Sequence, residues 1–147
     1  MNTTDKYMRR AIAQAYIGLE EEGIPIGSVL VKDGVVIGKG RNQRKQKANP
    51  ILHAEIDCLQ NAGRIRNYEG TVLYSTLMPC YLCAGAIVQF GIRKVVVGES
   101  STFAGASQFM KEHGVVVDDL DLDECKLLMR DFIDEFPEDW NEDIGIA

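Results

Sequence analysis

The 147-residue sequence has no apolar run close to the ~18 residues that would cross a bilayer, so we expect no membrane-spanning segment. Residues 1–6 lack the basic stretch and following apolar stretch of a secretory signal, which favours a cytoplasmic protein. Basic residues are also outnumbered by acidic ones: the chain has 16 Lys and Arg and 22 Asp and Glu, which gives a net charge of −6. A protein that grips a phosphate backbone usually presents a basic face, so this balance favours a small-molecule ligand over nucleic acid.

Four of the 16 basic residues lie close together in one polar stretch, from residue 40 to residue 50. This stretch contains Arg41, Arg44, Lys45 and Lys47. A cluster of charges in a loop more often forms a solvated surface than a binding site, and we interpret it in that way.

Cysteine and histidine are scarce, with four and two residues. Cys58 and Cys125 each stand alone in a helical pattern, which predicts small buried apolar side chains. Cys80 and Cys83 form a C-x-x-C pair, which in a reducing compartment indicates metal ligands or redox groups more often than a structural disulfide. His113 is predicted to be a surface residue at a helix end.

Helical and strand patterns alternate along the chain without an internal repeat or linker, which predicts a single domain over residues 1–147. Helices packed on both faces of a sheet are typical of such alternation, so we expect an α/β fold, a three-layer α/β/α sandwich with a central mixed five-stranded sheet. Helices are predicted at residues 5–22, 51–62, 79–90, 106–112 and 121–135, and strands at residues 28–31, 35–37, 71–75, 94–97 and 115–117.

Turn residues predict how some of these elements connect. Asp33-Gly34 is a strong two-residue hairpin signal, so the first two strands should pair antiparallel. The valine-rich strand at residues 94–97 should lie inside the sheet, parallel to the strand before it through a right-handed crossover. Gly23 and Gly91 are expected to end the first and third helices.

The C-x-x-C pair lies at the predicted start of a helix. Cys80 and Cys83 differ by about 300° around a helix, so their sulfurs lie near one face. Pro79 places them in the first turn, where unpaired N–H groups and the positive dipole end lower thiol pKa values. Such thiolates are the form that zinc binds.

His53 and Glu55 add an imidazole and a carboxylate to this set. They are separated by about 200° around a helix, so they can serve one site only if it lies beyond the end of the helix. Pro50 just upstream favours that arrangement. The sequence therefore predicts that two helix N-termini meet at one metal ion.

Three protein ligands, His53, Cys80 and Cys83, would leave one tetrahedral position open, which is the pattern of catalytic zinc. Two thiolates weaken the ion as a Lewis acid, so a neighbouring base is useful, and we assign Glu55 as the proton shuttle. The C-x-x-C pair alone would also fit a redox pair or half of a structural zinc site. The combined H-x-E and P-C-x-x-C pattern is typical of zinc-dependent nucleobase deaminases.

Beyond this motif, the chain resembles the small zinc-dependent cytosine deaminases of the fungal type, within the cytidine deaminase superfamily. The resemblance runs through most of the chain and is most discriminating at residues 140–145. It is also carried by residues 23–27, 40–42, 73–77, 96–99 and 132–135.

The resemblance implies a homodimer and a free base as substrate. Asn42 matches an asparagine that hydrogen-bonds the carbonyl edge of the pyrimidine. Asp143 matches a carboxylate that accepts the ring N1–H, which a nucleoside cannot donate because its ribose occupies N1.

The resemblance also implies how the ring is enclosed. Phe103 and Trp140 match aromatic walls, and residues 136–147 would form a lid that excludes water. Further polar contacts are expected from the backbone of Ala54, Met78 and Cys80.

Several residues depart from the family pattern. Lys45 stands in place of a pocket phenylalanine and Met78 in place of a serine, and Arg41, Ala54 and Asn141 also differ. Neither Lys45 nor Met78 touches the hydrolytic residues, so the expected reaction is deamination of cytosine to uracil and ammonia. The alternatives are a related amino-heterocycle (isocytosine, a pterin or guanine) and, ranked lower, tRNA adenosine.

A function from a different class is a zinc-stabilised interaction domain without activity. Loss of the catalytic glutamate would mark such a domain, and Glu55 is present.

Overall fold

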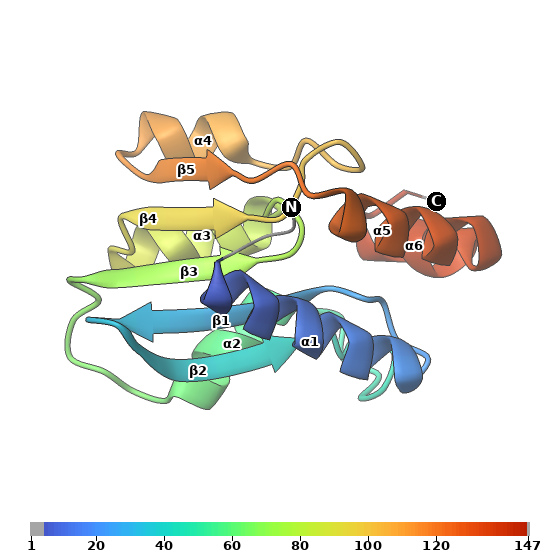
Figure 1. Ribbon diagram of the computed structural model, residues 1–147, viewed down its shortest axis with the longest axis horizontal. Helices are drawn as coiled ribbons and strands as arrows, with labels where there is room; N and C mark the ends of the chain where they lie inside the picture. Colours follow the sequence, from blue (N-terminus) through green and yellow to red (C-terminus); the bar gives the residue numbers. More distant parts are fainter. Residues whose placement is uncertain (1–4, 147) are drawn as a thin grey trace.

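The computed structural model describes residues 5–146 and contains one five-stranded sheet. The strand order is β2-β1-β3-β4-β5, with β1 antiparallel to both neighbours and β3, β4 and β5 parallel to one another (Figure 1). The predicted mixed sheet, with the parallel pairing of the third and fourth strands, is confirmed. The strands are β1 (Gly27–Lys32), β2 (Val35–Arg41), β3 (Thr71–Ser75), β4 (Lys94–Val97) and β5 (Val116–Asp119).

Helices cover both faces of this sheet, as the three-layer prediction requires. One buried cluster joins α2, α3 and α4 to the first face, and a second joins α1 and the start of α5 to the other. Cys58 lies in the first cluster and Cys125 in the second, so both are buried as predicted. The helices are α1 (Lys6–Glu20), α2 (Ala54–Ala62), α3 (Tyr81–Phe90), α4 (Ser107–Glu112), α5 (Asp123–Glu135) and α6 (Pro137–Asp143).

The hairpin between β1 and β2 forms where it was predicted. Asp33 and Gly34 both have positive φ, at 50° and 81°, which is the conformation that such a turn requires. β2 continues to Arg41, well beyond the predicted end at residue 37. Gly38 and Gly40 have low strand propensity, which is why the strand was predicted to end before them. Their lack of side chains allows α2 to lie directly on β2, since a Cβ on Gly40 would come within 2.3 Å of the Cys58 nitrogen.

Three predicted helix boundaries are wrong in a way that matters for the site. His53 is the N-cap of α2 and Cys80 the N-cap of α3, so both precede the helices in which they were predicted. Both have extended backbones, with ψ of 163° and −178°. α1 ends at Glu20, and Glu22 instead of Gly23 takes the left-handed conformation, with φ of 67°. Gly91 ends α3 as predicted, with φ of 82°.

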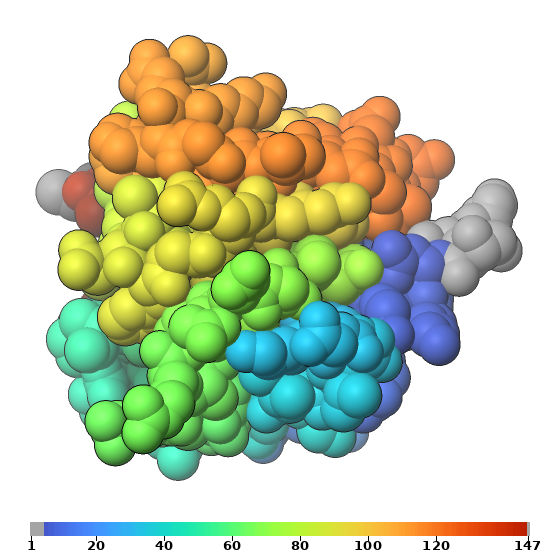
Figure 2. Space-filling view, turned by 90° about the vertical axis from the view of Figure 1, so that its left-hand side faces the viewer, coloured from blue at the N-terminus to red at the C-terminus, as the bar shows by residue number. Residues whose placement is uncertain are grey.

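The predicted tail contains a further helix, α6, that the sequence analysis did not assign. Pro137 occupies its first turn, where a missing N–H costs nothing, and Glu138 and Asp139 complement the positive end of the helix dipole. α5 and α6 lie beyond the edge of the sheet at which β3, β4 and β5 end (Figure 1). The opposite end, seen in Figure 2, includes the turn between β1 and β2 and the connection from α2 to β3.

No helix within residues 5–146 combines the length and apolar character needed to span a membrane. The remaining predicted elements agree with the observed ones to within two residues at each boundary.

Candidate active site

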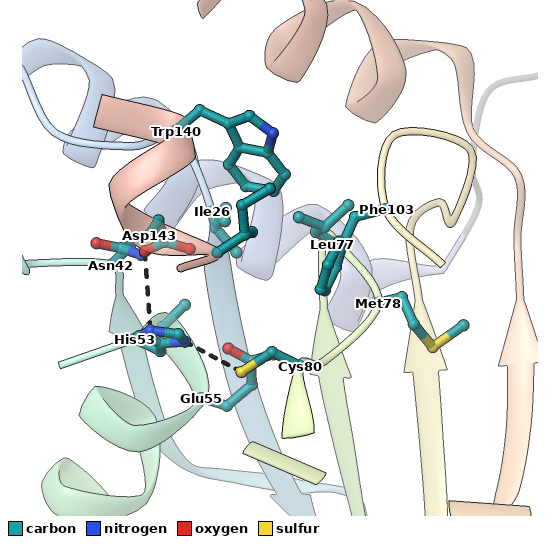
Figure 3. A pocket seen from close by; sticks show the side chains of 12 residues that line it. Ile26, Asn42, His53, Glu55, Leu77, Met78, Cys80, Phe103, Trp140 and Asp143 are labelled. Carbon is teal, nitrogen blue, oxygen red and sulfur yellow. Dashed lines mark hydrogen bonds and ion pairs between the residues drawn. The ribbon is translucent and has the colours of Figure 1, made fainter. Parts of the chain in front are cut away.

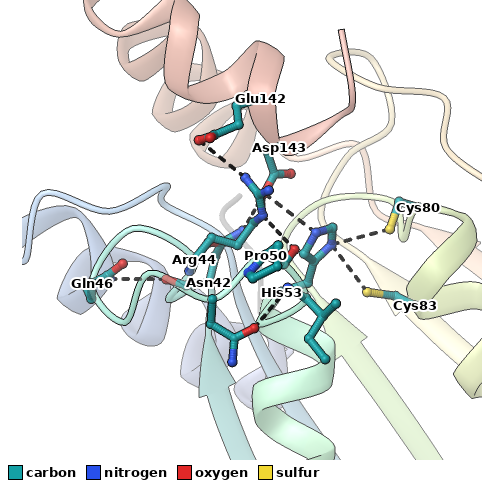
Figure 4. A network of polar contacts seen from close by, with 11 residues as sticks. Asn42, Arg44, Gln46, Pro50, His53, Cys80, Cys83, Glu142 and Asp143 are labelled. Atoms are coloured by element: carbon teal, nitrogen blue, oxygen red, sulfur yellow. Dashed lines mark hydrogen bonds and ion pairs between the residues drawn. The ribbon is translucent and has the colours of Figure 1, made fainter. Parts of the chain in front are cut away.

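Two helix N-termini meet at one point beside the end of β3, as the sequence predicted. The Nδ1 atom of His53, at the start of α2, lies 3.4 Å from the sulfur of Cys80 and 3.7 Å from that of Cys83 (Figure 4). Neither helix has a side-chain hydrogen bond capping its start, so the unpaired N–H groups of both first turns surround this point. The three potential ligand atoms lie within 4.8 Å of one another.

These distances fit a zinc ion. Tetrahedral zinc with usual bond lengths holds a nitrogen and a sulfur ligand roughly 3.6 Å apart, close to both separations around His53. Within residues 5–146, no fourth His, Cys, Asp or Glu joins the group. The donor set therefore leaves one tetrahedral position for a reactant, as in catalytic zinc sites.

The second ring nitrogen of His53 faces a carboxylate. Its Nε2 lies 3.8 Å from Oδ1 of Asp143, and the same oxygen accepts a 2.9 Å hydrogen bond from Nδ2 of Asn42 (Figure 3). A negative charge at this position favours the tautomer with a proton on Nε2, which leaves Nδ1 free to bind metal.

The two thiols have very different proton affinities when no ion is bound. A hydrogen bond from Cys83, helped by His53, lowers the pKa of Cys80 to about 4. The same contact with Cys80, together with burial, raises the pKa of Cys83 well above its usual value. The pair thus shares one proton between two sulfurs, and a zinc ion would replace that proton.

Glu55 lies in the first turn of α2 and is almost completely buried, with 4% exposure. Burial, with the Cys80 charge as the next cause, raises its pKa to about 7 when the metal is absent. Its Oε2 lies 3.3 Å from the hydroxyl of Ser75 at the end of β3. A carboxyl group with a pKa near neutrality can both accept and donate a proton.

A small pocket opens beside these groups. Asn42 and Asp143 lie on one side of it, and the rings of Phe103 and Trp140 meet edge to face at 5.8 Å on another (Figure 3). All six residues predicted to contact a substrate line the pocket. Its lining residues are Ile26, Asn42, His53, Ala54, Glu55, Leu77, Met78, Cys80, Phe103, Trp140, Asp143 and Ile144.

Sequence reasoning missed three lining residues, Ile26, Leu77 and Ile144. Ile26 and Leu77 lie in stretches that carried the family resemblance, but each reads as ordinary core. Ile144 follows α6, and only the fold of the tail brings it to the pocket.

Of the residues that depart from the family pattern, Met78 has its side chain in the core and Lys45 lies outside the pocket lining. The side chain of Met78 belongs to the core beneath α3 and points away from the pocket (Figure 3). Its N–H donates to the carbonyl of Glu99 at 3.0 Å, so only its own carbonyl remains for a ligand. Lys45 does not line the pocket, and its Nζ lies 2.9 Å from Asp139 of α6.

The other residues singled out in the sequence lie as predicted or have internal partners. His113 is exposed at the end of α4. Of the clustered basic residues, Arg41 pairs with Glu21 at 2.8 Å, and Arg44 lies 3.8 Å from both Glu142 and Asp143.

An α/β/α sandwich with three metal ligands, an open coordination position and a buried carboxylate defines a zinc-dependent hydrolytic enzyme. Residues 1–99 match the profile of the cytidine and deoxycytidylate deaminase zinc-binding region. The chain is 46% identical to a cytosine deaminase of Candida albicans over 143 residues, which cover 95% of each protein. The chain therefore belongs to the cytidine and deoxycytidylate deaminase family.

Solved structures agree with this assignment. A structure from studies of A-to-I editing by tRNA:A34 deaminases is 30% identical, with a TM-score of 0.66, over 77% of this chain and 95% of the other. A guanine deaminase from Nitrosomonas europaea superposes with a TM-score of 0.76 at 19% identity, over 90% of this chain and 85% of the other, and shows the same fold.

Proposed function

We propose that this protein hydrolyses free cytosine to uracil and ammonia. The observation that carries the proposal is one small pocket that is lined by Glu55 and two metal ligands, His53 and Cys80, and also by Asn42 and Asp143. Glu55 and the metal ligands can carry out hydrolysis, and Asn42 and Asp143 can orient a flat polar ring. The likeness to the cytosine deaminase of Candida albicans, over nearly the whole chain, supports the same substrate.

Asn42 and Asp143 are arranged to bind the pyrimidine edge. One hydrogen of the Asn42 amide is used by Asp143, and its Oδ1 accepts the N–H of Arg44 at 3.1 Å. The second amide hydrogen is therefore directed by the protein and can donate to the carbonyl oxygen of cytosine. Oδ2 of Asp143 then accepts the N1–H of the free base.

Glu55 moves the protons of the reaction. When bound, the zinc ion would supply the Lewis acidity that makes water a nucleophile at neutral pH. Glu55 accepts the two protons of the attacking water one after the other, and delivers the first to the ring nitrogen and the second to the departing amine. Burial of this carboxylate prevents exchange of those protons with bulk solvent.

We further propose that residues 136–147 act as a lid. Trp140 and Asp143, both on α6, together with Ile144 just after it, line the pocket, so movement of α6 would change access to it. A closed lid excludes water from the reacting ring, and a ribose on N1 would collide with the position of Asp143.

Deamination of tRNA adenosine is the second candidate, favoured by the 30% identity to the tRNA:A34 deaminase structure. Binding of a phosphate backbone needs cations that are free to meet it. In the loop that holds the basic cluster, Arg41, Arg44 and Lys45 are engaged by acidic side chains of the same chain. This engagement, with the net charge of −6, favours the free base.

Steady-state kinetics on a matched panel tests the proposal. The panel contains cytosine, cytidine, isocytosine, guanine, a pterin and an adenosine-containing tRNA anticodon stem-loop, with ammonia release as the common readout. Cytosine should have the highest kcat/KM, and cytidine should be inert because it has no N1–H. Undetectable turnover of cytosine beside turnover of another member would overturn the choice of substrate.

We also propose that the protein is a cytoplasmic homodimer. Support for the dimer comes from α3, which is apolar around its circumference yet leaves Tyr81, Leu82 and Phe90 between 44% and 73% exposed. A helix apolar on all sides is usually buried on all sides, and a second copy of the chain would cover this face.

A further inference from the structure

Segments of opposite charge, distant in the sequence, meet beside the pocket. Residues 41–47 contain four basic and no acidic side chains, whereas residues 134–143 contain six acidic and no basic ones. In the structure this basic loop lies against α6 (Figure 4). The clustered cations that resembled a solvated surface therefore have a partner inside the molecule.

Three residues of the loop contact α6 in order along the helix. Asp139 and Asp143 are four residues apart and so lie on one side of the helix, and Asp143 lines the pocket together with Trp140. The contacts are Asn42 with Asp143 at 2.9 Å, Arg44 with Glu142 and Asp143 at 3.8 Å each, and Lys45 with Asp139 at 2.9 Å.

Lys45 holds the end of α6 that is farther from the metal ligands. Its ammonium group also lies 5.3 Å from the centre of the Phe136 ring, which caps the start of α6. Lys45 and Asp139 are 46% and 28% exposed, so salt weakens this contact more than it weakens the buried contacts of Asp143. Lys45 does not line the pocket, and the partners of its ammonium group are Asp139 and Phe136 at the start of α6.

We infer that Lys45 is a positioning residue, which fixes the start of α6 and thereby sets how often Trp140 and Asp143 close the pocket. This inference rests on the proposed function, because it assigns α6 the role of a lid. An exposed ion pair is weak enough to break and re-form in each turnover, whereas a buried pair is costly to separate.

Trp140 provides a direct measurement, because it is the single tryptophan of the chain and is 6% exposed. Acrylamide quenching of its fluorescence reports how often α6 opens in the zinc-loaded protein. Lys45→Glu places a like charge opposite Asp139 and should raise the quenching constant about two- to fivefold. About 1 M salt should raise quenching of the wild-type protein in the same direction.

A charge swap makes the test specific. Asp139→Lys alone also removes a favourable charge from the first turn of α6, so it is the reference for the charge swap. Combining Lys45→Glu with Asp139→Lys restores the opposite charges and should bring quenching below that of Asp139→Lys alone. Lys47→Glu is the matched control, since it makes the same change of charge at an exposed lysine for which the described residues show no ion pair with α6. Unchanged quenching in Lys45→Glu, or a charge swap in which quenching is no lower than in Asp139→Lys alone, would overturn the inference.

Kinetics provides a second readout. If Lys45 acts on closure alone, Lys45→Glu should raise KM for cytosine more than it lowers kcat, because only the fraction of closed protein changes. An equal loss in kcat at constant KM would contradict a role in closure. A wild-type protein that does not turn over cytosine would overturn the proposed substrate, while the fluorescence comparison would still decide the role of Lys45.

Discussion

Replacement of Glu55 should greatly reduce catalysis while leaving metal binding intact. Glu55→Gln keeps the shape of the side chain and leaves His53, Cys80 and Cys83 in place, so zinc content should stay at one per chain. Turnover should fall about 10²–10⁴-fold because the amide cannot carry protons. Metal analysis and kcat on the same sample check both parts, and a variant with normal kcat would remove Glu55 from the mechanism.

Metal removal should distinguish the four thiols by their proton affinity. Burial raises the pKa of Cys58 and of Cys125 to about 12, whereas the pKa of Cys80 falls to about 4 in the metal-free site. At about pH 6 after chelation, Cys80 is therefore a thiolate and the other three are thiols, since the pKa of Cys83 is raised.

Alkylation with iodoacetamide, read by peptide mass spectrometry, should label Cys80 first. Zinc-loaded protein is the control and should be protected at this position. Equal labelling of Cys80 and Cys58 after chelation would contradict the assigned difference.

At the scale of residues, the sequence predicted the metal-binding and proton-transfer residues better than it predicted the contacts around them. The spacing of His53, Glu55 and the two cysteines was enough to predict the metal centre, because zinc chemistry restricts which residue types can occupy it. The partner of Lys45 could not be predicted, since Asp139 is distant in the sequence and many acidic residues offer the same charge.

At the scale of elements, α2 positions more residues of the site than the two that its H-x-E motif identifies. Asp57, also in its first turn and 2% exposed, accepts hydrogen bonds of 3.0 Å from the N–H of Arg41 and from the side chain of Gln43. These two residues flank Asn42. The helix that supplies His53 and Glu55 thus also holds the loop that presents the substrate-orienting amide.

Asp57→Ala should therefore affect stability and substrate binding together. Two buried donors lose their acceptor, which should lower the free energy of unfolding by about 1–3 kcal/mol. KM for cytosine should rise because Asn42 is no longer held. Denaturant unfolding and kinetics measure the two effects, with Asp57→Asn as the control that keeps an acceptor oxygen, and an unchanged KM in Asp57→Ala would oppose this role.

Hydrophobic periodicity predicted the long helices and strands, but it did not predict the end of β2 or the helix α6, both of which depend on tertiary packing. β2 was predicted too short because Gly38 and Gly40 have poor strand propensity, yet the close approach of α2 requires them. α6 escaped prediction because a seven-residue helix is stable only through its tertiary contacts, here between Trp140 and the pocket.

At the scale of the whole molecule, the proposed dimer can be tested with two leucines of equal exposure. Leu82 on α3 and Leu127 on α5 are 44% and 43% exposed and lie in opposite layers. If α3 forms the interface, Leu82→Glu should convert the protein to monomers, because a buried unpaired charge is costly. Leu127→Glu should leave the mass unchanged, as measured by light scattering after gel filtration. Dissociation by Leu127→Glu with no effect of Leu82→Glu would place the interface elsewhere.

The position of β3 has a consequence for how the protein matures. β3 is the middle strand of the sheet, and the ligands flank it in sequence, with His53 before it and Cys80 and Cys83 after it. During synthesis on the ribosome, the set of ligands is therefore complete only after β3 has been made, because Cys80 and Cys83 follow it in the chain. We expect a chain truncated after β3 to bind the ion less tightly than a chain that includes both cysteines.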